Sequence, residues 1–252
     1  MLIINSLHLI NLHFWTYLQV TAEMRRYNLH ILGISESRWI GSGRYRTNTG
    51  EMVLYSGRDD NQHHEGVAVT LKKGMEKCLM EWKPINSRLM KIRMKGKQIN
   101  ITIIQCYVPT NDSEEESKDA FYDQLQAKLE RTPYDEMKIV MKDLNAKVVS
   151  DNTSHDRAMG KEGCGSMTNN GKRLLEFCMA YDLVVGGTLF PHHEIHKLTW
   201  SSPKARDKNQ IDHLMINGHG NGHGNLEEDD VQMPLKLVRV AQAARVNFKS
   251  VS

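Results

Sequence analysis

The stretch "INITIIQCYV" (residues 99–108) decides the fold class of this 252-residue chain. It is rich in β-branched residues and almost continuously apolar, which is typical of a central strand with both faces buried. A helical pattern follows at 111–131, and a second apolar strand, "MKIVMKDLN", follows at 137–145. Strands that alternate with helices in this way indicate an α/β fold.

The segment 111–131 gives the clearest helical pattern in the sequence. Asn, Asp and Ser at 111–113 are residue types that cap helices, and acidic residues crowd the first turns, where the helix dipole favours them. Phe121, Leu125 and Leu129 recur every four residues and therefore fall on one face. We expect that face to pack against the sheet.

The remaining segments predict mostly strands, with polar residues at several strand ends. We expect a helix and then a strand within 20–36, and a helix and then a strand within 169–188. Further strands are expected at 51–57, 66–74, 89–94, 196–202 and 209–217. Loops that follow the strands of an α/β fold often carry its chemistry.

Composition places the chain among ordinary globular proteins, with 40% hydrophobic and 25% charged residues. The net charge of +3 and the pI of about 8.6 are mildly basic and do not by themselves establish nucleic-acid binding. Residues 1–100 carry 15 Lys and Arg against 8 Asp and Glu. A phosphate-facing surface is therefore expected in this part, and a solvated basic face is the equal alternative.

Four cysteines, Cys78, Cys106, Cys164 and Cys178, form no CxxC pair, which predicts reduced and mostly buried thiols of an intracellular protein. The apolar start of the chain, residues 1–18, lacks a basic region and a cleavage site and is too polar to span a bilayer. We expect no signal peptide and no membrane segment. The sequence decides neither between nucleus and cytoplasm nor the oligomeric state.

Polar side chains that a structural strand does not need stand at four strand ends: Glu36, Tyr107, Asp143 with Asn145, and Asp212. Carboxylates and amides there could serve metal binding and acid–base chemistry. Each position also has a structural alternative. These are a salt bridge from Glu36 to Arg38, an Asx-turn at 143–145, and ion pairs of Asp212 with basic residues of 206–208.

As an ordered set, these segments resemble a known family. "ISESRW" (34–39), "QCYVPTND" (105–112), "DLNAK" (143–147) and "LTWSSPKARDKNQIDHLMI" (198–216) are similar to motifs of the endonuclease/exonuclease/phosphatase superfamily. Within it, the chain resembles the apurinic-endonuclease-like domain of RTE-type non-LTR retrotransposons. The motifs are specific as a set, although no single one is.

The resemblance implies a four-layer α/β sandwich, in which two mixed β-sheets lie face to face and helices cover the outside. It implies Mg²⁺-dependent hydrolysis of phosphodiester bonds, with DNA as the partner and Mn²⁺ as an alternative metal. The likeness covers residues 19–217. Residues 1–18 are a divergent N-terminal strand region, and residues 218–252 are a divergent linker and tail, so the fold is expected to be incomplete at both terminal strands.

The roles of the strand-end residues follow from the same resemblance. Glu36 would bind Mg²⁺, Asp143 would hold or deprotonate the attacking water, and Asn145 would donate a hydrogen bond to the phosphate. Tyr107 would contact the phosphate or the leaving oxygen. Asp212 would orient the catalytic groups or assist the metal.

A nucleic-acid rim is implied at Arg38 and Trp200, although a buried Trp on a strand is an equal reading of Trp200. The family has an Asn on its first strand that helps to place the metal. Asn5 is the candidate substitute for it and is therefore a further candidate metal ligand. "GHGNGHGN" (218–225) predicts a flexible linker, and a His-based metal site is the weaker alternative.

The chain departs from the family pattern in ways that predict weak or absent catalysis. The first-strand Asn is missing from its usual motif, Ser-Asp-His occurs nowhere in the 252 residues, and Lys142 stands where the family has Gly. Whether the chain is an enzyme is therefore open. The alternative is an interaction or structural protein that uses the fold as a scaffold and binds DNA weakly at most.

Overall fold

The structure is a computed structural model that describes ten stretches of the chain. These are residues 2–4, 21–22, 24–26, 28–143, 147–148, 152–163, 166–189, 200–201, 208–209 and 212–217. For residues 2–4, 142–143, 200–201, 208–209 and 212, only the backbone is described.

One sheet has five strands in the order β1-β2-β5-β4-β3. The strands are β1 (Leu2–Ile4), β2 (Ile31–Ser35), β3 (Ser42–Arg46), β4 (Met52–Ser56) and β5 (Val67–Leu71). The edge strand β1 runs parallel to β2, and the other neighbours are antiparallel. The sequence predicts a fold that is incomplete at both terminal strands. At the N-terminus, the structure has a short strand of three residues, β1.

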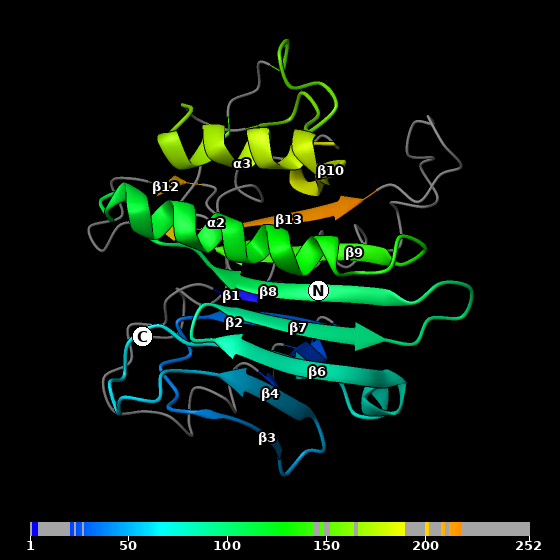
Figure 1. Cartoon of the computed structure of the whole chain (residues 1–252). Helices are drawn as coiled ribbons and strands as arrows, with labels where there is room; N and C mark the ends of the chain where they lie inside the picture. The colour runs from blue at the N-terminus through cyan, green and yellow to red at the C-terminus, as the bar shows by residue number, and fades with distance from the viewer. Residues whose placement is uncertain are drawn as a thin grey trace.

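The second sheet has six strands in the order β10-β13-β9-β8-β7-β6, most of which are seen side by side in Figure 1. The strands are β6 (Leu79–Asn86), β7 (Leu89–Met94), β8 (Ile101–Tyr107), β9 (Met137–Asp143), β10 (Leu183–Val185) and β13 (Asp212–Asn217). The strand β8 lies inside the sheet, parallel to β9 and antiparallel to β7, as its apolar sequence predicts. A separate ladder joins β11 (Trp200–Ser201) to β12 (Lys208–Asn209).

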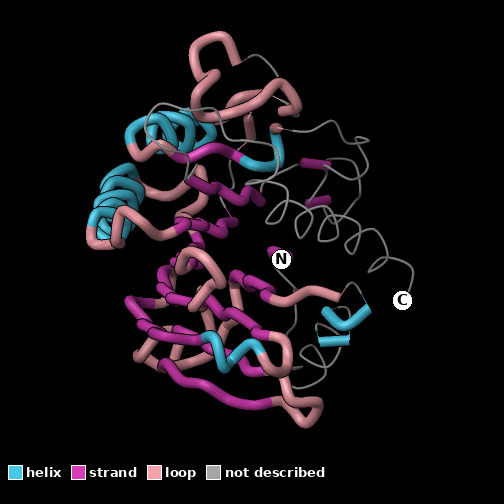
Figure 2. The backbone as a smooth tube through the Cα atoms, turned by 90° about the vertical axis from the view of Figure 1, so that its right-hand side faces the viewer, coloured by secondary structure: helices cyan, strands magenta, loops and turns pink. Residues whose placement is uncertain are grey.

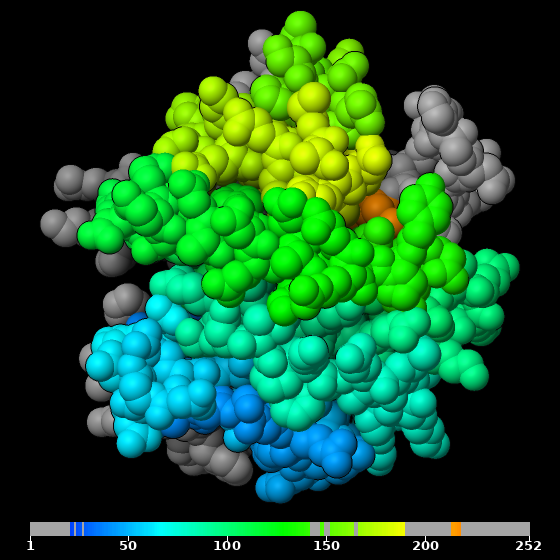
Figure 3. Space-filling view, viewed as in Figure 1, coloured from blue at the N-terminus to red at the C-terminus, as the bar shows by residue number. Residues whose placement is uncertain are grey.

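Two long helices, α2 (Glu115–Glu130) and α3 (Asn169–Ala180), lie together on one side of the strands (Figure 2). They cover a continuous part of the surface in the space-filling view (Figure 3). The predicted caps at 111–113 are wrong, because α2 begins later, with Glu114 at the N-cap position and no side-chain cap. Short 3₁₀ turns form at η1 (Met75–Cys78) and η2 (Gly186–Thr188).

Two apolar cores separate these layers. The first lies between the helices and the six-stranded sheet and contains the predicted face of α2, Phe121, Leu125 and Leu129. The second lies between the two sheets, with Val69 and Leu71 on one side and Ile103 and Met141 on the other. The predicted α/β sandwich of two mixed sheets flanked by helices is therefore confirmed.

The cysteines behave as small buried residues where they are described. Cys106 and Cys178 are buried free thiols, and Cys78 is a half-buried one. The prediction of mostly buried thiols is thus confirmed for Cys106 and Cys178, and Cys164 lies outside the described residues. None of the helices in the described part of the chain is long and apolar enough to cross a membrane.

Glu136, which is 1% exposed and directly precedes β9, gives the folding equilibrium an expected pH dependence. Burial raises the pKa of this carboxyl, but hydrogen bonds from Arg93 and Thr102 outweigh it and hold the pKa below its ordinary value of 4.5. A lowered pKa adds stability above the ordinary value, and that stability is lost as the pH falls through the folded-state pKa. Urea unfolding should therefore show a steeper acid-side loss in the wild type than in Glu136→Gln. Identical slopes below pH 4.5 would contradict this.

Candidate active site

The ends of three neighbouring strands place three of the predicted site residues in one row. Tyr107, the last residue of β8, pairs in register with Asp143, the last residue of β9. Asp143 in turn pairs with Asp212, the first residue of the antiparallel strand β13. The row follows from topology, because parallel strands end at the same edge and an antiparallel neighbour begins there.

The strand β2 of the other sheet ends beside this row. The side chain of Gln105 donates from Nε2 to Ser35 Oγ (3.1 Å), and Ser35 Oγ donates to the carbonyl of Cys106 (3.2 Å). The two sheets approach closely because Gly33 has no side chain, and a Cβ at that position would lie 2.1 Å from Gln105 Oε1. Glu36, the residue after β2, is thereby brought to the end of β8.

The phenol of Tyr107 and the carboxylate of Glu36 are in direct contact. Tyr107 donates its O–H to Glu36 Oε1 at 2.8 Å. The other carboxylate oxygen lies 3.9 Å from Arg38 Nη2, so the salt bridge given above as a structural alternative is also present. Glu36 keeps 21% of its side chain exposed and Arg38 keeps 28%, which leaves the group accessible to solvent.

The loop that carries Glu36 has an unusual backbone. Glu36 (φ 53°) and Arg38 (φ 56°) both adopt the left-handed region, which is costly for residues other than glycine. Such conformations persist only where the surroundings hold them, and they cluster at functional sites. Here Ser37 donates its backbone N–H to the carbonyl of Gly66 (2.9 Å), and Arg38 donates to that of Glu65 (2.8 Å).

The same loop ends in an aromatic cluster. The indole of Trp39 packs edge-on against Tyr55, with centroids 4.5 Å apart, and more loosely against Tyr45 at 5.9 Å. Behind it, Gly57 lies so close that a Cβ there would be 1.6 Å from the carbonyl oxygen of Trp39. The loop is therefore fixed by packing as well as by hydrogen bonds.

The structure brings together some of the predicted residues and leaves others undescribed. The side chains of Glu36, Tyr107 and Arg38 lie together, and the backbones of Asp143 and Asp212 occupy paired positions at the same edge. Trp200 lies in β11, where its backbone pairs with Asn209. The remaining two, Asn5 and Asn145, lie outside the described residues, as does the Gly-His-rich segment 218–225.

The donor chemistry at this edge suits a hard divalent cation. Glu36 offers carboxylate oxygens, and Mg²⁺ needs only one or two protein carboxylates because it keeps several of its waters. Among the side chains that the structure describes, no group of three or more His, Cys, Asp or Glu is arranged to hold a metal. A second carboxylate ligand would come from the paired positions 143 and 212, whose side chains are not described.

Sequence reasoning missed three residues that support this site: Glu65, Arg88 and Gln105. Gln105 is fully buried between the sheets, and Arg88 and Glu65 form an ion pair beside Tyr107. A polar residue inside the apolar run "TIIQCY" is the signal that could have revealed Gln105. The Arg88–Glu65 pair joins residues 23 positions apart, and nothing in their local sequence marks them.

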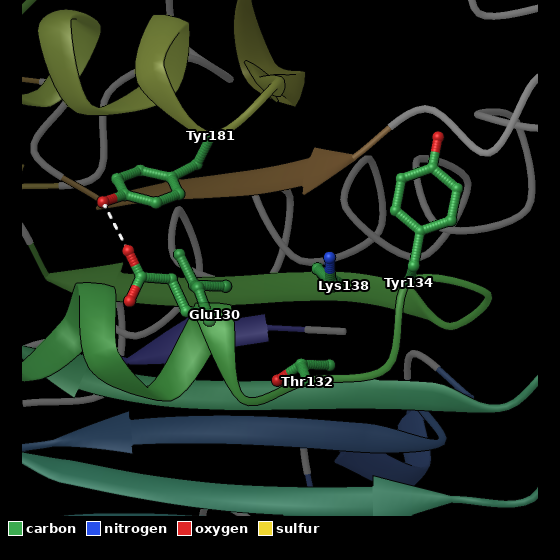
Figure 4. A pocket seen from close by; sticks show the side chains of 6 residues that line it. Glu130, Thr132, Tyr134, Lys138 and Tyr181 are labelled. Atoms are coloured by element: carbon green, nitrogen blue, oxygen red, sulfur yellow. Dashed lines mark hydrogen bonds between the residues drawn. The ribbon is translucent and has the colours of Figure 1, made fainter. Parts of the chain in front are cut away.

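A separate pocket of about 200 Å³ lies at the opposite end of β9, near Lys138. Figure 4 shows Tyr134 on one side and Tyr181 on the other, with the Tyr181 hydroxyl donating to Glu130 Oε1 at 3.4 Å. Because Lys138 is the second residue of β9 and Asp143 is the last, this pocket is not part of the candidate site.

Comparison with known sequences gives two curated relatives and no matching family model. Craniofacial development protein 2 of Bos taurus is 36% identical over 196 residues, which are 78% of this chain and 32% of that protein. The protein of the same name from Tragulus javanicus is 35% identical over 196 residues, with 78% and 33% covered. The chain therefore spans about one third of the length of the curated relatives it matches.

Solved structures share the fold at low identity. The endonuclease domain of TRAS1, a telomere-specific non-LTR retrotransposon, has a TM-score of 0.52 and 12% identity, covering 79% of this chain and 78% of its own. The AP endonuclease LMAP from Leishmania major has a TM-score of 0.54 and 12% identity, covering 78% and 72%. These neighbours are of the endonuclease/exonuclease/phosphatase type, so the predicted fold is confirmed, and at this identity the likeness concerns the fold alone.

Proposed function

Because this chain is a relative of craniofacial development protein 2 with the fold of the endonuclease/exonuclease/phosphatase proteins, we propose that it hydrolyses phosphodiester bonds in nucleic acid. The reaction is Mg²⁺-dependent and of the apurinic-endonuclease type, and the domain derives from a non-LTR retrotransposon. Its rate is low, because parts of the family's catalytic machinery are missing from the sequence.

The observation that carries the proposal is the contact between Tyr107 and Glu36. Their 2.8 Å hydrogen bond joins two sheets at the edge where Tyr107 is the register partner of Asp143, and Asp143 is that of Asp212. Paired positions lie on the same face of a sheet. This register supports a shared site for Glu36, Tyr107, Asp143 and Asp212, the kind of cluster that metal-assisted phosphodiester hydrolysis requires.

Each residue has a role in this reaction. Glu36 and Asp212 would hold Mg²⁺, which when bound polarises the phosphate and neutralises charge on it. Asp143 accepts the proton of the attacking water, and Asn145 donates a hydrogen bond to the phosphate oxygen as charge builds there. Tyr107 holds the Glu36 carboxylate in place through its O–H, and it would contact the phosphate or the leaving oxygen.

Three departures from the family slow this reaction. The Ser-Asp-His motif is missing, and so is the usual motif of the first-strand Asn, for which Asn5 is the candidate substitute. A lost general acid or base costs about 10²–10⁴-fold in rate. The third is Lys142, directly before Asp143, which stands where the family has Gly. A Lys can pair with a carboxylate, compete with the metal, or crowd a tight turn that Gly would allow.

Cleavage assays test the proposal directly. Supercoiled plasmid and a short duplex with one abasic site are incubated with excess protein, in Mg²⁺ and in EDTA. We expect slow Mg²⁺-dependent nicking, faster on the abasic duplex than on the intact one. Cleavage that is equal in Mg²⁺ and EDTA, or that is undetectable in both, would rule the proposal out.

Tyr107→Phe should lower the cleavage rate by about tenfold. The variant removes only the O–H that binds Glu36, and a hydrogen bond to a charged group is worth about 1.5 kcal/mol, close to one factor of ten. Single-turnover rates with the abasic duplex measure the effect. Tyr55→Phe is the matched control, because that phenol lies in the aromatic cluster with Trp39, and the rate should not change. An unchanged rate in Tyr107→Phe would contradict the role given to this hydroxyl.

A further inference from the structure

Arg88, which precedes β7, contacts Tyr107 in three ways. Its guanidinium carbon lies 4.9 Å from the centroid of the Tyr107 ring. Its Nη1 donates to the Tyr107 carbonyl at 3.3 Å, and its own carbonyl accepts the Tyr107 N–H at 2.9 Å. Arg88 therefore fixes both the ring and the backbone of the residue that binds Glu36.

Glu65 holds the other side of Arg88. Its Oε1 accepts a hydrogen bond from Arg88 Nη2 at 2.7 Å, and its Oε2 accepts one from Ser87 Oγ. The guanidinium of Arg58 lies 3.6 Å from the same carboxylate. Only 16% of the Glu65 side chain is exposed, so these bonds are well shielded from solvent.

Glu65 also reaches the loop that carries Glu36. Its carbonyl accepts the Arg38 N–H at 2.8 Å, and the next carbonyl, of Gly66, accepts the Ser37 N–H at 2.9 Å. Glu65 itself adopts a left-handed backbone (φ 61°), as Glu36 and Arg38 do. Three non-glycine residues in this costly conformation thus lie in two loops that hydrogen-bond to each other.

We propose that Arg88 and Glu65 are a positioning pair that keeps the Tyr107 phenol in contact with the Glu36 carboxylate. One end of the pair fixes Tyr107, and the other end fixes the backbone of residues 37–38, next to Glu36. The inference rests on the proposed function, because it assigns these residues to the same site. Neither residue touches the reacting atoms.

A lysine cannot replace Arg88 in this role. The planar guanidinium stacks on the ring while donating to two acceptors in different directions, whereas an ammonium is a point charge on a flexible stem. A simple surface ion pair would tolerate Arg88→Lys, since partly exposed pairs contribute little to stability. Arg88→Lys therefore separates positioning from general structural support.

The strand β7 offers a matched control at its other end. Arg93 also pairs with a glutamate, the buried Glu136, and Arg93 is 29% exposed, against 27% for Arg88. It lies far along the strand from Tyr107, which pairs with the Arg88 end. Arg93→Lys should therefore disturb an equivalent ion pair without changing the candidate site.

Two readouts test the pair in the full chain. The first is kcat and KM for Mg²⁺-dependent cleavage of the abasic duplex. We expect Arg88→Lys to lower kcat by about tenfold, the lower end for residues that orient a metal ligand, with KM nearly unchanged. The second is amide hydrogen exchange at Ser37, Arg38 and Tyr107, which should speed up in Arg88→Lys and stay constant in Arg93→Lys.

The outcomes distinguish this inference from the proposed function. If the wild type cleaves and Arg88→Lys cleaves equally well, the positioning pair is wrong. If the wild type does not cleave, the proposed function is wrong, and hydrogen exchange alone tests the positioning pair. Faster exchange at the three amides in Arg88→Lys, but not in Arg93→Lys, supports the pair. Unchanged exchange in Arg88→Lys overturns it. Equal effects of Arg88→Lys and Arg93→Lys on exchange would also overturn it.

Discussion

Asp143→Ala should lower Mg²⁺-dependent cleavage of the abasic duplex by about 10²–10⁴-fold, the range for removing a general base. Asp143 ends β9 and is the register partner of both Tyr107 and Asp212, so it stands at the centre of the row of strand ends. The change removes the proton acceptor while keeping the backbone of β9. The rate is measured under single-turnover conditions, since the wild type itself is expected to be slow.

Asp135→Ala is the control for this change. Asp135 is exposed and lies just before β9, at the end of the strand away from Tyr107. Its replacement should leave the rate unaltered and the free energy of unfolding within about 0.5 kcal/mol. If Asp143→Ala cleaves as fast as Asp135→Ala, the strand-end row is not the catalytic site.

Gly57→Ala should destabilise the fold by about 3 kcal/mol, the upper part of the range for overpacking. The added Cβ would lie 1.6 Å from the carbonyl oxygen of Trp39, and this obstacle is backbone, which cannot rotate away as a side chain can. Gly57 also donates its N–H to the Gly41 carbonyl at 2.7 Å, so the strain passes to both ends of the segment 39–41. Urea unfolding monitored by far-UV circular dichroism measures the loss.

The same variant should also reduce cleavage, because the displaced loop carries Glu36 and Arg38. Ser42→Ala provides the comparison: Ser42 is exposed in the edge strand β3, and its replacement should change stability by no more than about 0.5 kcal/mol. A Gly57→Ala protein as stable and active as Ser42→Ala would show that the close packing behind Trp39 has no consequence.

The sequence predicts the buried strands well and the edge strands poorly. The strand β8 is apolar and β-branched and lies inside its sheet, whereas β3 and β6 were not expected at all. Both are outermost strands, where one side of the ladder is unpaired and burial demands no regular apolar pattern. The sequence of β3, "SGRYR", is mostly exposed, and β6 contains Pro84, which only an edge strand tolerates.

Sequence patterns likewise predict some residues of the candidate site and not others. Glu36 and Tyr107 stand at the ends of apolar strands, and this local pattern, together with the family motifs, points to both residues, which the structure places in contact. Arg88 and Glu65 could not be found in this way. Their partners lie in segments far apart in the sequence, and their positions depend on how two sheets and three loops pack.

Binding of Mn²⁺, followed by the broadening of backbone amide resonances, tests most directly whether the strand ends form one metal site. It does not depend on the rate of cleavage. We predict that substoichiometric Mn²⁺ broadens the amides of Glu36, Tyr107 and Asp212 first. Lys138 and Asn217, at the opposite ends of β9 and β13, should keep their intensity until more Mn²⁺ is added. Broadening that begins in the Gly-His-rich segment 218–225, or that spares Glu36 and Tyr107, would contradict the account.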